Sequence, residues 1–149
     1  MASLKKSNKT FECVICSLVL CCIDDSEAEN VMMDVRKLVT DSGTAIITIC
    51  NPLSSFVEQT LLHTKLDIPQ NVSDSSHFTY HKKTHETGNI KTEYHRPLSW
   101  YYDLFSRCGF LIDYVTEIES VDIKNLLPSS EFILFRLNPQ CSSLPERRM

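Results

Sequence analysis

The feature that most limits which folds this chain can adopt is its longest apolar run. It reads FECVICSLVLCCIDD, from Phe11 to Asp25, and ends in two aspartates. Cys13 to Cys16 are apolar at every position, so a strand here has no polar face and is expected to be buried on both sides, as in the centre of a parallel sheet. The run is shorter than the roughly 20 residues that cross a bilayer, and this disfavours a membrane span.

A helix and a second strand are predicted after this run. Ser26 and Glu29 have capping-box spacing, which predicts a helix over about residues 27–40. Gly43 is expected to end the turn, and residues 44–50 (TAIITIC) form a β-branched run that predicts a second buried strand. Strand, helix and strand at this spacing favour a crossover unit with parallel strands.

The second half of the chain has fewer clear signals. A short helix is expected around Phe56 to Leu62, followed by an irregular insertion over about residues 67–93. A helix with Pro97 in its first turn and Gly109 as its C-cap comes next. Residues 110–118 and 131–137 then predict two strands, with a possible helix over residues 123–127 between them, and this short connection favours antiparallel pairing.

Together these elements predict one α/β domain. The expected architecture is a partial Rossmann-like sheet of about four strands, the last two antiparallel, with helices on the faces. Residues 1–10 form a polar lead-in, residues 11–137 the domain, and residues 138–149 a tail for which disorder is expected.

Composition limits the partners and the compartment. The net charge of -4 gives no general attraction to phosphate backbones, which disfavours a nucleic-acid partner. The first ten residues have no signal-peptide pattern, and seven cysteines scattered through apolar runs suggest thiols kept in a reducing compartment. The expected location is the cytoplasm.

Three segments, in this order, resemble the C-terminal half of class I S-adenosylmethionine-dependent methyltransferases of the small-molecule type. They are FECVICSLVLCCIDD, LVTDSGTAIITICNP and HRPLSWYYDLFSRCGFLIDYVTEIES. The first is similar to the family's central strand, the second to the next helix end and strand, and the third to the late helix, its "GF" turn and the following strand. The resemblance implies S-adenosylmethionine as cofactor and methyl transfer to an O, N or C nucleophile of a small molecule.

The glycine-rich cofactor loop of that family is absent. With only three glycines no GxGxxG can be written, and only ten residues precede Phe11. The Phe11 strand is therefore expected at an exposed sheet edge, where a protein partner or a second copy could pair with it. The alternatives are a truncated methyltransferase and a non-catalytic interaction or regulatory remnant.

The resemblance also implies site residues. Ser17 and Leu18 correspond to cofactor-binding positions, although Ser17 could instead satisfy a backbone group where the strand ends. Asn51 follows the second strand at the edge where α/β sheets bind ligands, or is a turn former beside Pro52. In the substrate-side region, Tyr94 is a substrate-binding candidate.

Two residues next to Tyr94 have possible chemical roles. His95 could act as a general base, and Arg96 could clamp a carboxylate or a phosphate. The alternative for both is helix-entry chemistry or surface charge.

A metal site is a more distant alternative. His77, His81 and His85 are four residues apart and would share one face of a helix, where they could bind zinc, but the surrounding sequence favours a solvated loop. Cys13 and Cys16 mimic a C-x2-C motif, yet on a strand they point to opposite faces. The sequence analysis therefore assigns no metal ligands.

Overall fold

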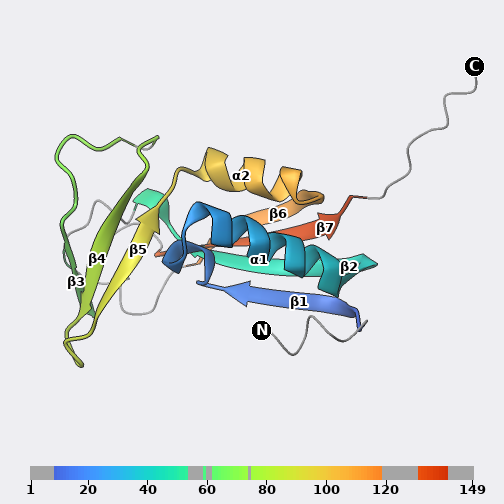
Figure 1. Cartoon of the computed structure of the whole chain (residues 1–149), viewed down its shortest axis with the longest axis horizontal. Helices are drawn as coiled ribbons and strands as arrows, with labels where there is room; N and C mark the ends of the chain where they lie inside the picture. The colour runs from blue at the N-terminus through green and yellow to red at the C-terminus, as the bar shows by residue number, and fades with distance from the viewer. Residues whose placement is uncertain (1–8, 54–58, 60–61, 74, 119–130, 141–149) are drawn as a thin grey trace, which may run out of the picture.

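A computed structural model describes residues 9–53, 59, 62–73, 75–118 and 131–140 of the 149-residue chain. It contains a mixed four-stranded sheet with strand order β1-β2-β7-β6 and a separate antiparallel sheet with order β3-β4-β5 (Figure 1). The first sheet consists of β1 (Phe11–Ser17), β2 (Val39–Cys50), β6 (Phe110–Ile118) and β7 (Phe132–Pro139). The second consists of β3 (His63–Leu66), β4 (Phe78–Thr84) and β5 (Ile90–His95).

Strand directions in the larger sheet agree with the sequence prediction. β1 and β2 are parallel, with Ile15 opposite Ile46, and they are joined by α1 (Asp25–Leu38). β6 and β7 are antiparallel, as their short connection predicted, and β7 also pairs antiparallel with β2. The predicted α/β class, with a partial Rossmann-like sheet, is confirmed.

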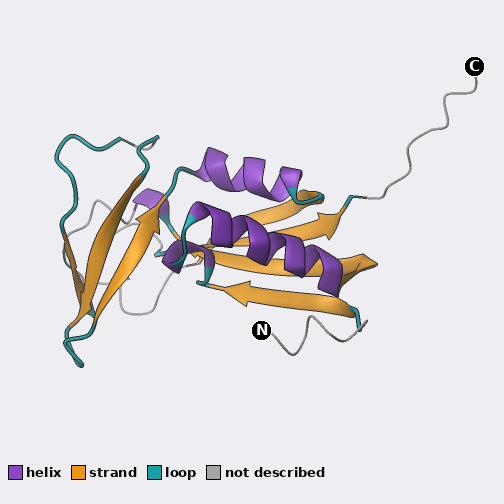
Figure 2. Ribbon diagram, viewed as in Figure 1, coloured by secondary structure: helices purple, strands orange, loops and turns teal. Residues whose placement is uncertain are grey.

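Both helices pack on the same face of this sheet, α1 across β1 and β2 and α2 (Leu98–Arg107) beside it (Figure 2). The core forms between them because α1, α2, β2 and β7 each turn an apolar side to the same layer. Its fully buried members are Leu20, Ala28, Met32, Ala45, Ile47, Ile49, Leu104, Phe105, Phe135 and Leu137. None of the described helices is long and apolar enough to cross a membrane.

β1 is not buried on both sides, and in this respect the sequence prediction is wrong. Cys16 faces the helices and is buried, but Ile15 on the opposite face is 69% exposed. β1 is an edge strand of the described sheet, as the missing glycine-rich unit led us to expect. Cys13 and Cys16 do point to opposite faces, one exposed and one buried.

The boundaries of α1 differ from the prediction. The cap is Asp24, whose Oδ1 accepts from the Glu27 amide at 2.9 Å, while the Glu27 carboxylate accepts from the Asp24 amide. The capping box therefore begins two residues before Ser26, because an aspartate accepts from the amide three residues later as well as a serine does. The helix ends at Leu38, and β2 begins at the next residue.

Gly43 lies inside β2 and not in a turn. Val39 pairs with Phe11 and Thr44 with Cys13, so a bulge occupies the start of β2. A Cβ on Gly43 would lie 2.8 Å from the Glu12 carbonyl oxygen, which explains why only glycine fits this approach.

The irregular insertion predicted over residues 67–93 is wrong. Most of it forms the β4–β5 hairpin, whose turn includes Gly88 at φ +67°. The side of the small sheet that is buried carries polar side chains, among them Lys65 and Glu93, so no apolar alternation marked these strands.

Several other expectations have a definite outcome. Gly109 ends α2 at φ +79°, as predicted, whereas Pro97 is the N-cap of α2 and not a residue of its first turn. Asn138 and Pro139 belong to β7 and not to the disordered tail that was expected from residue 138. Residues 54–58, 60–61, 119–130 and 141–149, which include most of the helix expected near Phe56 and all of the one over residues 123–127, lie outside the described part.

Candidate functional site

The carboxyl ends of β1 and β2 point toward the three-stranded sheet (Figure 1). Ser17 is the last residue of β1, and its hydroxyl lies 2.7 Å from the Thr48 hydroxyl on β2. Leu18 then turns into the left-handed region at φ 55° while its amide donates to the Thr48 carbonyl oxygen at 2.9 Å. A non-glycine residue in this conformation is uncommon and redirects the chain sharply. Both predicted cofactor positions thus lie at this edge.

The segment after Leu18 is held by Arg96 from the end of β5. A short 3-10 helix, η2 (Leu20–Cys22), precedes α1. The Arg96 guanidinium donates to the carbonyl oxygens of Leu20 and Ile23, each at 2.6 Å, and its Nε donates to Asp25 at 2.8 Å. Arg96 is 1% exposed and lies 4.4 Å from the centre of the Trp100 ring. In this geometry the guanidinium binds protein groups on all three nitrogens.

The other predicted substrate-side residues are divided between the interior and the surface. His95 is buried and stacks on the Phe78 ring at 4.5 Å between ring centres. Asn51 is 1% exposed; its side chain accepts from the Leu53 amide at 3.1 Å, which matches the turn-forming alternative. Tyr94 is half-buried and lines an open hollow. Substrate binding by these residues and catalysis by His95 remain predictions.

This hollow has a volume of about 590 Å³ and lies where the two sheets approach each other. Its wall is built from the start of α1, the start of β4 and the end of β5; the lining residues are Asp24, Asp25, Ser26, His77, Phe78, Thr79 and Tyr94. The two carboxylates face an imidazole and two aromatic rings, with His77 Nε2 3.4 Å from Asp25 Oδ1. Such a wall suits a ligand that carries hydroxyl groups or positive charge.

Six of these seven residues were not predicted as site residues. The two aspartates that end the opening apolar run were a usable signal, because acidic residues after a strand of an α/β sheet lie at its ligand-binding edge. His77 was considered only as one of three possible zinc ligands, and no signal marked Phe78 and Thr79, since the strand that they belong to was itself missed.

A buried polar network lies on the inner side of the small sheet. Glu93 accepts from the Tyr80 hydroxyl at 2.6 Å and pairs with Lys82 at 3.0 Å. Burial lowers the pKa of Lys65 to about 8, and burial also lowers the pKa of His63 to about 4. These groups are held by one another and are not presented to the hollow.

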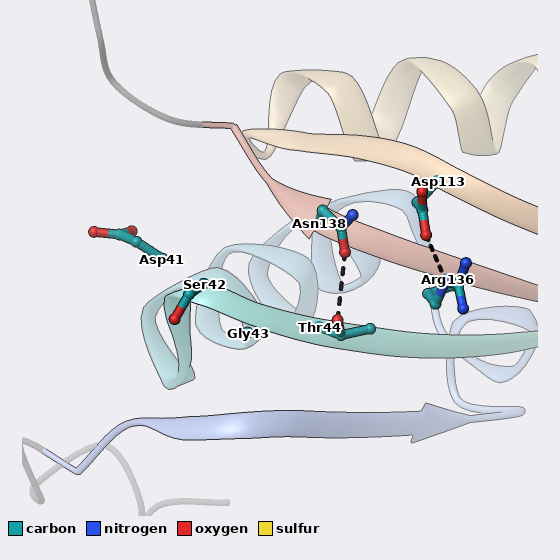
Figure 3. A pocket seen from close by; sticks show the side chains of 7 residues that line it. All are labelled: Asp41, Ser42, Gly43, Thr44, Asp113, Arg136 and Asn138. Atoms are coloured by element: carbon teal, nitrogen blue, oxygen red, sulfur yellow. Dashed lines mark hydrogen bonds and ion pairs between the residues drawn. The ribbon is translucent and has the colours of Figure 1, made fainter.

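A second hollow, of about 410 Å³, lies at the opposite end of the sheet (Figure 3). Arg136 is ion-paired with Asp113 there, and Thr44 donates to the Asn138 amide oxygen at 3.3 Å. Asp41, the third charged residue of the lining, pairs with Arg36 of α1 at 2.8 Å, so its charged groups already have partners. The hollow is also remote from the carboxyl ends of β1 and β2.

The three histidines do not form a metal site. His81 lies within β4 and pairs with Asp67 at 2.8 Å, His77 approaches Asp25, and His85 contacts the Thr64 hydroxyl. On an extended strand, residues four apart are separated by roughly 13 Å. No group of three or more His, Cys, Asp or Glu side chains within the described part is arranged to hold a metal ion.

Neither a family model nor a curated protein matches this chain, but solved structures do. A putative S-adenosylmethionine-dependent methyltransferase from Listeria monocytogenes superposes with a TM-score of 0.61 at 18% identity, covering 90% of this chain and 63% of that protein. One from Clostridium acetobutylicum gives 0.57 at 16%, covering 91% and 61%. One from Methanosarcina mazei gives 0.62 at 14%, covering 89% and 61%.

The chain has a class I methyltransferase-like fold. The predicted resemblance is therefore confirmed at the level of the fold. Another structure with this fold is a glycopeptide N-methyltransferase bound to S-adenosylmethionine, at 14% identity and a TM-score of 0.61. This chain spans 53–63% of the lengths of the matched proteins.

The hollow beside α1 lies where a fold of this type is expected to bind a ligand. Ligands of open α/β sheets bind outside the carboxyl ends of the strands, and the hollow lies beyond the carboxyl end of β1. The residues present fit only part of S-adenosylmethionine. Asp24 is engaged as a helix cap, Asp25 is held by Arg96, and no glycine lies beside the hollow, where a backbone could approach the cofactor closely.

Proposed function

We propose that this chain acts as one part of an S-adenosylmethionine-dependent methyltransferase that modifies an O, N or C atom of a small molecule. The observation that supports this is the acidic hollow at the carboxyl end of β1 within a methyltransferase-like fold. A sulfonium cofactor is positively charged and carries ribose hydroxyls, both of which suit carboxylate neighbours. A thiol-rich composition fits work in the cytoplasm.

The glycine-rich cofactor loop must then come from another polypeptide segment. Gly43 lies in the β2 bulge, Gly88 in a hairpin turn and Gly109 at the end of α2, so none of them can serve this purpose. The edge of β1 is the place where such a segment would pair, because its backbone groups on that side have no strand beside them in the described sheet.

Calorimetric titration with S-adenosylmethionine tests the cofactor part of this proposal. We expect weak, saturable binding in the submillimolar to millimolar range, since only part of the site is present. Thr79→Lys adds a positive charge to the hollow and should weaken binding at least threefold. Thr92→Lys makes the same substitution elsewhere on the small sheet, at an exposed residue of β5, and should leave binding unchanged.

Two results would count against the proposal. Absence of heat and of thermal stabilisation up to millimolar cofactor would exclude a cofactor-contacting role for this chain. Equal effects of the two lysine substitutions would place the cofactor outside the hollow.

A non-catalytic interaction module is the second candidate, and the exposed edge favours it. Ile15 is 69% exposed at this edge. The residues in register with it on the neighbouring strands are Ile46 on β2, then Arg136 on β7 and Tyr114 on β6. An exposed isoleucine beside a second isoleucine at an open strand edge invites pairing with a protein partner or a second copy. Sedimentation velocity should show self-association that Ile15→Lys abolishes; a monomer at all concentrations would leave a different protein as the only partner of this edge.

A further inference from the structure

Three cysteine sulfurs converge where η2 meets the end of β2. Cys21 and Cys22 lie in η2, and Cys50 is the last residue of β2. The Cys50 Sγ is 3.6 Å from the Cys21 Sγ, which is 4.0 Å from the Cys22 Sγ. We call Cys21, Cys22 and Cys50 the thiol cluster. The Cys21 and Cys50 sulfurs are within reach of bond formation after a small shift of either side chain, whereas a bond between the sequence neighbours Cys21 and Cys22 would be strained.

Access to the cluster is graded. Cys22 is exposed, Cys50 is partly buried, and Cys21 is only 3% exposed. An oxidant from solution therefore meets Cys22 first, while Cys21 is shielded between the other two sulfurs. A reactive thiol beside a thiol that can resolve it is the arrangement typical of redox-sensitive cysteines.

The electrostatics agree with this order. The hydrogen bond from Cys21 lowers the pKa of Cys22 to about 7, although burial and the nearby Glu93 carboxylate oppose this. The bonds with Cys22 and Cys50 together with burial raise the pKa of Cys21, so that it stays protonated. At neutral pH a large fraction of Cys22 is the nucleophilic thiolate.

We propose that the thiol cluster is an oxidation site for hydroperoxides, in which a two-electron oxidation joins Cys21 to Cys50 in a disulfide. This inference rests on the positions of the sulfurs and is independent of the proposed function. In sum, two thiols and one hydroperoxide give one disulfide, one alcohol and one water; with hydrogen peroxide the alcohol is a second water.

The reaction proceeds in three steps. The Cys22 thiolate attacks the terminal peroxide oxygen, the O–O bond breaks, and the alcohol leaves after taking up a proton. The Cys21 sulfur then attacks the Cys22 sulfenic sulfur while its proton passes to the leaving hydroxyl, so that water is released and a bond forms between the adjacent sulfurs. Finally the Cys50 sulfur attacks the Cys21 sulfur as its proton leaves, and Cys22 is expelled as a thiolate.

Two effects favour the last step, one thermodynamic and one kinetic. A disulfide between sequence neighbours is strained, and strained disulfides exchange readily. Cys22 is also the better leaving group because the more acidic thiol leaves faster. The product joins η2 to β2 and regenerates the exposed thiolate.

The disulfide would change the segment that follows β1. In the reduced chain the Cys21 sulfur lies 3.4 Å from the Leu18 carbonyl oxygen, in position to donate its S–H. Oxidation removes the S–H that Cys21 donates to the Leu18 carbonyl oxygen. The new bond also fixes η2 to the end of β2. The left-handed residue Leu18 is thus placed next to a covalent link that depends on the redox state.

The experiment is oxidation of the purified full-length chain with hydrogen peroxide, followed by mass spectrometry of the intact protein and of its tryptic peptides. We expect the loss of two hydrogens and a cross-linked pair of peptides, 10–36 and 38–65, that dithiothreitol separates; Cys50 is the only cysteine in the second peptide. The rate should rise with pH and level off above about 7, as the ionisation of Cys22 predicts.

Single substitutions identify the sulfurs. Cys50→Ser should abolish the cross-link, and Cys21→Ser should reduce its yield at least fivefold. Cys22→Ser should slow its formation at least tenfold. Cys13→Ser is the matched control, because Cys13 lies in the same tryptic peptide but is exposed on β1, and it should react like the unchanged chain.

Two outcomes would overturn the proposal. One is oxidation of the unchanged chain to a sulfinic acid at Cys22 with Cys50 still free. The other is a cross-link that persists unchanged in Cys21→Ser. Because the unchanged chain itself distinguishes disulfide from sulfinic acid, the test does not depend on the folding of any variant.

Discussion

Replacement of Arg96 by alanine would remove the contact that holds the segment between β1 and α1. Arg96 is 1% exposed and makes two bonds of 2.6 Å to the carbonyl oxygens of Leu20 and Ile23, and one of 2.8 Å to Asp25. The substitution leaves two carbonyl groups without their donor and opens a space beside Trp100. We therefore expect a large loss of stability from one side chain.

The magnitude can be worked out bond by bond. The two bonds to carbonyl oxygens are made by a charged donor and contribute roughly 1.5 kcal/mol each. The Asp25 side chain is 51% exposed, so its bond contributes only about 0.5 kcal/mol. The cation–π contact with Trp100 adds about 0.5 kcal/mol. The expected loss is about 4 kcal/mol, a large part of the total stability of a small domain.

Urea denaturation followed by circular dichroism measures this loss, and the fluorescence of Trp100, the single tryptophan, is a second probe. Arg96→Lys keeps the charge but cannot reach all three acceptors, and should lose about 2 kcal/mol. Arg107→Ala is the matched control: its side chain is 58% exposed and 4.0 Å from Glu29, so the loss should stay below about 0.5 kcal/mol. A loss below about 1 kcal/mol for Arg96→Ala would refute the reasoning.

Three further substitutions test other parts of the structure. Gly43→Ala places a Cβ 2.8 Å from the Glu12 carbonyl oxygen and should cost about 2 kcal/mol of unfolding free energy in urea. Tyr80→Phe removes a buried bond of 2.6 Å to Glu93 and should cost about 1.5 kcal/mol in the same assay. His63 has a folded pKa of about 4, below its unfolded value, so only the unfolded state takes up its proton as the pH falls from about 6.5 to 4, and stability declines over this window; His63→Gln should make the decline measured between pH 7 and 4.5 shallower.

Each of these has a control in the same chain. Gly88→Ala meets no atom within 4 Å but carries φ +67°, so it should cost only about 1 kcal/mol of backbone strain. Tyr102→Phe, at a residue that is 40% exposed, should be neutral. For His63→Gln the comparison is the unchanged chain, measured at the same pH values. An equal effect of test and control in any pair would contradict the structural explanation given for it.

The larger sheet could be predicted from the sequence because its strands obey simple patterns. β2 alternates small and branched apolar residues, Ala45, Ile47 and Ile49, that all face α1 and α2, and the short path from β6 to β7 leaves only antiparallel pairing. Gly109 could be placed because a helix that ends in a positive φ requires such a residue.

The smaller sheet could not be predicted, because its buried side is stabilised by hydrogen bonds and ion pairs. Lys82, Glu93 and Tyr80 satisfy one another in the interior, and a pattern search treats such residues as exposed. A sequence shows that these side chains are polar but not that their partners lie on the next strand. The hollow was missed for the same reason, since half of its wall comes from these strands.

The predicted site residues had different outcomes for a related reason. Ser17 and Leu18 lie at the strand end where the resemblance put them, since that position depends only on where β1 ends. Arg96, in contrast, was predicted to clamp a carboxylate or a phosphate, with helix-entry chemistry or surface charge as the alternative, whereas its three acceptors in the structure belong to a segment more than 70 residues earlier in the chain. Long-range contacts of this kind are not visible as local spacing.

The position of β7 between β2 and β6 has a consequence for biosynthesis. β2 ends at Cys50, but the strand that covers its second edge begins only at Phe132. At a synthesis rate of about 5–20 residues per second, that edge waits roughly 4–16 s for its partner. During this interval the isoleucines of β2 form a template open to other nascent chains, so we expect the yield of folded protein in the cell to depend on chaperones that bind extended apolar segments.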